Sequence, residues 1–180
     1  MNRLIFQLAA AFAAPLIAGA AAATIALDGP AQDLAGRYTR AHEVGMVRGE
    51  PFQAEDVVEI APVSAEAAYV SLQLNFFNGH MCELSGVARA EGEALLYTEP
   101  AWDDPEMPRC QLRIDRRGDS LHLGDGGGSC RVYCGARGSL HEADLPWASR
   151  VRIDDLDRLR ESDAYRWALE EWRTRRRVHP

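Results

Sequence analysis

The sequence lacks the short motifs that mark most enzyme and metal sites. It has no His-Glu-x-x-His motif, no Gly-x-Ser-x-Gly elbow, and no Gly-Lys-Ser/Thr after its glycine run. Those motifs supply zinc ligands, a serine nucleophile and phosphate-binding amides, so we predict no catalytic residue, no metal site and no cofactor. Ser139, His141 and Glu142 are close along the chain, but a catalytic triad is defined by its geometry in space.

Charge is absent from Leu4 to Leu27, directly after Arg3. An apolar run that follows a positive residue and ends in small residues, here Ala21-Ala22-Ala23, is typical of a secretory signal peptide. We therefore predict a signal peptide over residues 1–23, cleaved before Thr24, and a periplasmic or secreted mature protein with no stable membrane span. Retention of the same run as a membrane anchor is the alternative.

The chain is acidic, with a formal net charge of −7 at pH 7. This charge disfavours nucleic acid as a partner and suits a basic protein. The one strongly basic stretch, Arg173-Thr174-Arg175-Arg176-Arg177, is interpreted as cations in the last turn of a helix, where they interact favourably with the helix dipole.

Cysteine is scarce, and the four residues present are Cys82, Cys110, Cys130 and Cys134. An even count in an exported chain predicts two disulfides, for which three pairings are possible. The favoured pairing joins Cys130 to Cys134 and Cys82 to Cys110. Three residues separate Cys130 from Cys134, whereas thioredoxin-like and zinc-knuckle motifs have two, and no second close pair completes a metal site, so a structural role is predicted.

Short runs of alternating apolar residues indicate strands. The clearest extends from Tyr69 to Phe76, and turn signals such as Asn78-Gly79 separate it from similar runs at roughly ten-residue spacing. We expect a mainly β fold, a small antiparallel meander or up-and-down barrel, because closure removes exposed sheet edges. The further runs include Val58–Ile60, Leu95–Tyr97, Leu112–Ile114 and Leu121–Leu123, and Gly36-Arg37-Tyr38 is expected to open the first strand.

From Asp154 onward glycine is absent and helix-forming residues dominate. Ser162 is predicted to cap an α-helix over Ala164–Arg175, and a shorter helical piece is expected around Asp155–Arg160. The domain prediction is therefore a disulfide-bonded β-domain over residues 24–150 and a C-terminal helical extension over 151–180.

The segment Gly128–Gly138 is the most distinctive in the chain. A loop held by disulfides that displays Arg131, Tyr133 and Arg137 would present these side chains rigidly, and Arg and Tyr dominate binding hot spots. We predict these three residues as partner contacts. The alternative is that Tyr133 packs in the core and the arginines are solvated.

The spacing of Asn78-Gly79-His80, Cys82, Gly86-Val87-Ala88, Cys110-Gln111-Leu112 and Cys130…Cys134-Gly135-Ala136-Arg137-Gly138 resembles uncharacterised exported proteobacterial proteins with a small disulfide-bonded β-domain. That domain is similar to the β-modules of bacterial lysozyme-inhibitor-like proteins. The resemblance covers roughly Ala68 to Leu140. A departure is that Ser85-Gly86 is followed by Val87, Ala88 and Arg89, whereas periplasmic lysozyme inhibitors carry a Ser-Gly-x-x-Tyr loop.

The resulting hypothesis is a non-enzymatic binding protein, an inhibitor or immunity-type cap for a basic cell-wall hydrolase or a toxin. A small-ligand carrier is one alternative, and it requires a cavity inside the barrel. An envelope enzyme of unrecognised type is the other, and it requires a cleft in which His80 or His122 lies beside a carboxylate.

Overall fold

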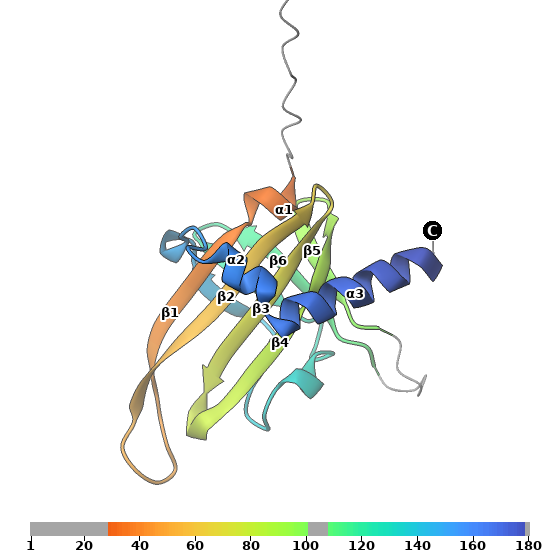
Figure 1. The fold of residues 1–180 in the computed structure, drawn as a ribbon. Helices are drawn as coiled ribbons and strands as arrows, with labels where there is room; N and C mark the ends of the chain where they lie inside the picture. The colour runs from red at the N-terminus through yellow and green to blue at the C-terminus, as the bar shows by residue number, and fades with distance from the viewer. Residues whose placement is uncertain (1–28, 101–107, 179–180) are drawn as a thin grey trace, which may run out of the picture.

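The computed structural model describes residues 29–100 and 108–178, and it shows eight antiparallel strands in one nearly closed, barrel-like sheet (Figure 1). Each strand is hydrogen-bonded to the next in chain order, which confirms the predicted meander. The predicted signal peptide lies outside the described residues. The strands are β1 Gly36–Val44, β2 Phe52–Ser64, β3 Ala67–Phe76, β4 His80–Glu91, β5 Ala94–Thr98, β6 Gln111–Arg117, β7 Ser120–Gly124 and β8 Ala143–Pro146.

The predicted turn between β3 and β4 is a short 3₁₀ segment, η1, at Phe77–Gly79. Asn78 has φ 61° and Gly79 has φ 71°, the left-handed backbone that these two residue types tolerate best. Local turn chemistry therefore fixes the register in which Phe76 pairs with His80.

The barrel interior is filled by large apolar side chains. Alternate residues of the strands point inward, as the period of two requires, and they are almost wholly buried. This explains why the alternating runs identified the strands correctly. The interior set includes Tyr38, Val58, Ile60, Val70, Leu72, Leu74, Leu84, Leu95, Leu112, Ile114, Leu121, Leu123 and Leu145.

The barrel closes where β1 meets the chain that follows β8. Arg37 and Val151 exchange two backbone hydrogen bonds, each 2.9 Å long, and the Thr39 amide donates to Ser149 Oγ at 3.0 Å. Ser149 belongs to the 3₁₀ segment η3, Trp147–Ser149. A short helix α1, Pro30–Asp33, precedes β1 and lies at one end of the barrel (Figure 1). Few backbone hydrogen bonds therefore join the two edges of the sheet among the described residues, and a hydrogen bond to the Ser149 side chain adds to them.

The sheet separates between β2 and β3 beyond the pair Val57–Gln73. Asp56, which is fully buried, occupies this position and accepts hydrogen bonds from the Asn75 amide at 2.6 Å and from Arg40 Nη2 at 2.6 Å. His42 Nε2 lies 3.1 Å from the same carboxylate. Burial alone would raise the pKa of Asp56, but these hydrogen bonds together hold it below its usual range.

The C-terminal segment forms two helices, α2 at Leu156–Glu161 and α3 at Asp163–Val178. Ser162 Oγ accepts a hydrogen bond from the Tyr165 amide, which confirms the predicted N-cap. α3 crosses the outer face of β3 and β4, where Tyr165 and Leu169 pack against Tyr69 (Figure 1). Tyr69, on the outward face of its strand, is buried for this reason. No helix in the described ranges is both long and apolar enough to cross a membrane.

The predicted disulfide pairing is wrong, although two disulfides are present. Cys82 of β4 bonds to Cys134, and Cys110, just before β6, bonds to Cys130. Cys130 and Cys134 are separated by a 3₁₀ turn, η2, at Arg131–Tyr133, which leads the chain from β6 across to β4. Cys134 forms an isolated β-bridge with Cys82, so the pairing follows from the place where this loop meets β4 and not from the sequence spacing.

Candidate functional site

The connection between β7 and β8, residues 125–142, lies at the end of the barrel opposite α1 (Figure 1). We call it the β7–β8 loop. Its two disulfides bind it to β4 and to the start of β6 on either side of η2. Gly138 passes so close to the Cys82–Cys134 bond that a Cβ there would lie 2.8 Å from Cys82 Sγ. The loop is therefore held tightly against the barrel.

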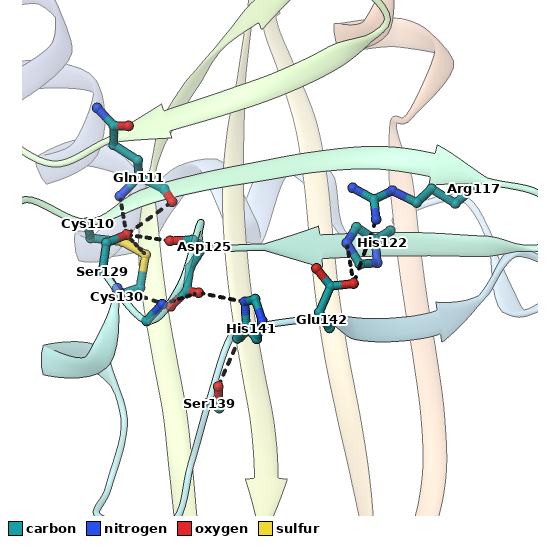
Figure 2. A network of polar contacts seen from close by, with 11 residues as sticks. Cys110, Gln111, Arg117, His122, Asp125, Ser129, Cys130, Ser139, His141 and Glu142 are labelled. Atoms are coloured by element: carbon teal, nitrogen blue, oxygen red, sulfur yellow. Dashed lines mark hydrogen bonds and ion pairs between the residues drawn. A yellow bond between two sulfur atoms is a disulfide. The ribbon is translucent and has the colours of Figure 1, made fainter.

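A buried carboxylate organises the first half of the loop. Asp125 Oδ1 accepts from the Gly128 amide at 2.8 Å, and its Oδ2 accepts from the Cys130 amide at 3.2 Å. Ser129 Oγ donates a hydrogen bond to the Asp125 carbonyl and accepts one from the Gln111 backbone amide. Figure 2 shows this network beside the Cys110–Cys130 disulfide, with His141 Nδ1 facing Asp125 at 3.5 Å. The glycine run is thus a structured turn.

Tyr133 points into the protein. Its hydroxyl donates to Glu99 Oε1 and lies 3.2 Å from the Tyr97 hydroxyl, while Glu99 Oε2 accepts the Cys110 amide. Burial and then the hydrogen bond to Glu99 raise the pKa of Tyr133. Tyr133 therefore holds the loop from inside, as the alternative interpretation expected.

Arg131, Val132 and Arg137 are exposed on the outside of the same loop. Val132 has an exposed fraction of 55%, which is high for an aliphatic side chain. The Arg137 guanidinium lies 5.2 Å from the centre of the Phe77 ring, so a neighbouring turn supports it. The structure thus separates the three predicted contact residues into one inward and two outward side chains.

Exposed apolar side chains gather around this loop. Among the described residues, five of the seven exposed large hydrophobic side chains belong to segments at this end: Val47, Phe52, Phe77, Met81 and Val132. Hydrogen bonds connect these segments, from the Asn78 amide to the Gly45 carbonyl at 2.8 Å and from the Gly135 amide to the Met81 carbonyl at 2.8 Å. We call this surface, with Arg131 and Arg137, the loop end.

Sequence reasoning missed the apolar part of the loop end. Phe77 stands directly before a turn and Val47 lies between two predicted strands, positions where apolar residues are unusual. Apolar residues at these two positions were the signal in the sequence that could have indicated an exposed apolar surface. Nothing in the sequence indicated that Glu99 and Asp125 would be buried beneath the loop.

Histidine–carboxylate pairs are present, but they lie away from the described pockets. His122 is 2% exposed, and its Nδ1 lies 2.9 Å from Asp144 Oδ1. Its Nε2 lies 3.6 Å from Glu142 Oε2 (Figure 2). Ser139 Oγ accepts the His141 backbone amide, and no contact joins this hydroxyl to a described histidine ring. Within residues 29–100 and 108–178 no group of three or more metal-ligating side chains is placed to hold an ion.

No protein-family model, curated protein or solved structure matches this chain.

Proposed function

We propose that this protein is a periplasmic or secreted, non-enzymatic binding protein that caps a protein partner with its loop end. The observation that carries the proposal is the concentration of exposed apolar side chains on and around the disulfide-bonded loop. Exposed apolar patches on otherwise polar surfaces mark interaction sites. The two disulfides support an oxidising compartment, and export through the predicted signal peptide would deliver the protein to one.

Rigidity supports the same proposal. A loop that is already rigid before binding loses less conformational entropy when a partner docks on it. Here η2 lies between two cystines, and the internal hydrogen bonds of Tyr133 fix it further. The backbone that carries Arg131, Val132 and Arg137 is therefore already fixed before binding, and Tyr133 contributes by holding it in place.

The partner class we propose is a basic cell-wall hydrolase or a toxin. The net charge of −7 attracts a basic protein at long range, whereas the loop end itself adds the two cations Arg131 and Arg137. The resemblance to lysozyme-inhibitor-like β-modules suggests the hydrolase. The carrier alternative has less support, because the described interior positions hold packed aliphatic side chains. The enzyme alternative has less support too, since His122 is buried.

The test uses mature, oxidised protein beginning at Thr24. It is added to a panel of lysozymes, and the clearing of a cell-wall suspension is followed. We expect stoichiometric inhibition of one type, with an affinity that falls as salt rises. Absence of inhibition across the panel would reject lysozyme-type hydrolases as the partner.

A matched pair of variants locates the surface. Val132→Asp places a charge in the loop end, and we expect it to weaken binding at least about tenfold. Val151→Asp makes the same change at an equally exposed valine, 54% against 55%, near the opposite end of the barrel. Equal effects from the two variants would overturn the proposed surface.

A further inference from the structure

The end of the barrel beside α1 carries a second feature, separate from the loop end. A depression of about 650 Å³ lies between α1, the β4–β5 turn, β6 and η3. Its lining includes Leu34, Trp147 and three arginines, Arg113, Arg116 and Arg150. Mouths of β-barrels are among the places where small-molecule sites recur.

Two guanidinium groups lie against one indole ring in this depression. Arg116 is 4.4 Å and Arg150 is 5.0 Å from the centre of the Trp147 ring, and Tyr38 packs against the same ring at 5.5 Å. Neither arginine forms an ion pair with a carboxylate among the residues that the structure describes. The two cations beside this ring repel each other, and a bound anion would offset that repulsion.

The hydrogen bonds of the two arginines leave donors for a ligand. Arg150 Nε donates to the Ala35 carbonyl at 2.8 Å, which fixes the side chain beneath α1 while its Nη1 makes no hydrogen bond to a described residue. Arg116 Nε donates to the Gly118 carbonyl at 3.0 Å. Neither Nη atom of Arg116 makes a hydrogen bond to a described residue. The free N–H groups therefore belong to partly fixed guanidiniums.

The carboxylates of the lining do not neutralise this pair. Asp115 is bound by Arg113 at 3.1 Å and by Arg117 at 3.2 Å. Asp33 and Glu93 are exposed at the rim and form no ion pair within the described part of the chain. Burial raises the pKa of Tyr38, beneath the ring, to about 12, against the opposing effect of Arg150 and Arg116.

We propose that this depression binds a small molecule with a phosphate group, held by Arg116 and Arg150 beside Trp147. A guanidinium presents two parallel N–H donors that match a pair of phosphate oxygens, and the bond between opposite charges is stronger than a neutral one. Pro30 and Leu34, in the same lining, offer apolar contact to the remainder of the ligand. The site goes beyond the proposed capping function and does not depend on it.

The test is calorimetric titration of the mature, oxidised protein with inorganic phosphate and with phenyl phosphate. We expect saturable binding of both, tighter for phenyl phosphate because its ring adds this apolar contact. Arg116→Gln should weaken binding about tenfold or more, whereas Arg131→Gln, the same charge change at the loop end, should leave it within about twofold. Unfolding midpoints of both variants check that the fold is intact.

Vesicles separate the two sources of such an anion. Binding to phosphatidylglycerol vesicles but not to phosphatidylcholine vesicles, lost in Arg116→Gln, would identify a lipid headgroup as the ligand. Saturable binding of the soluble phosphates alone would identify a free metabolite-sized anion. No binding of either kind with a Kd below about 10 mM, or equal binding by Arg116→Gln, would overturn the proposal.

Discussion

Removing the Cys82–Cys134 disulfide should release the β7–β8 loop while the barrel stays folded. The double variant Cys82→Ala/Cys134→Ala opens a bond whose partners are 52 residues apart in sequence. Chain-entropy arguments give about 4 kcal/mol for a closed loop of that length, reduced slightly because the Cys110–Cys130 bond is nested within it. A domain with a packed core is stable by roughly 5–15 kcal/mol, so we expect a weakened but folded protein.

Limited trypsin digestion measures the released loop directly, because trypsin cleaves after arginine and the loop contains Arg131 and Arg137. In the native protein, η2 is fixed on both sides by cystines and a protease cannot extend it. In the variant, local opening no longer requires the barrel to open, so cleavage at these arginines should be at least about tenfold faster. Cleavage after Arg113, inside β6, is the internal control and should change little.

The matched control is Cys110→Ala/Cys130→Ala, which opens a bond across 20 residues. Its expected cost is about 3 kcal/mol, and it leaves Cys134 bound to β4. Cleavage after Arg137 should then increase less than in the first variant. Unchanged digestion of the loop in the folded Cys82→Ala/Cys134→Ala protein would refute the argument that this disulfide holds the loop in place.

Three further perturbations test the packing. Because hydrogen bonds hold the pKa of Asp56 below its usual range, its contribution exists above about pH 4 and disappears as pH falls through the lowered value. Asp56→Asn should therefore lose about 3 kcal/mol in urea unfolding at pH 7, with a smaller difference from wild type at pH 3; equal losses at both pH values would exclude an electrostatic origin. Leu169→Ala should cost about 2–3 kcal/mol by chemical denaturation, whereas Trp167→Ala, at a side chain 78% exposed, should stay within about 0.5 kcal/mol; the reverse order would show that α3 packs differently. Tyr133→Phe should lose about 2 kcal/mol, since it deletes a hydrogen bond to the buried Glu99, and an unchanged unfolding midpoint would place the Tyr133 hydroxyl in solvent.

Local signals predicted most of the barrel. The run from Tyr69 to Phe76 alternates because one face of β3 lines the interior, and Asn78-Gly79 defines the next turn. The strand β8 carried no such signal, because Ala143–Pro146 is short and includes a proline. It forms a strand because it pairs with β7, residue by residue from Ser120–Pro146 to Leu123–Ala143. The sequence of a single segment does not contain information about such pairing.

The disulfides show the same limit. Nearness in sequence favoured the pair Cys130–Cys134, but bond formation depends on which Cα atoms approach within disulfide range in space. Cys134 lies 4.0 Å from Cys82, measured between Cα atoms, since the loop crosses to β4 after η2. That crossing depends on the order of strands around the barrel.

The orientation of η2 is linked to a buried carboxyl group as well as to the two disulfides. Glu99 is 2% exposed, and a carboxylate removed from water requires hydrogen-bond donors. The Cys110 amide supplies one donor, and Tyr133 supplies another only if its ring points inward. A 3₁₀ turn has three residues, so fixing Tyr133 inside leaves Arg131 and Val132 to face the solvent. The inward contact between Tyr133 and Glu99, a residue 32 positions upstream of Arg131, therefore contributes to the exposure of the side chains that we propose as partner contacts.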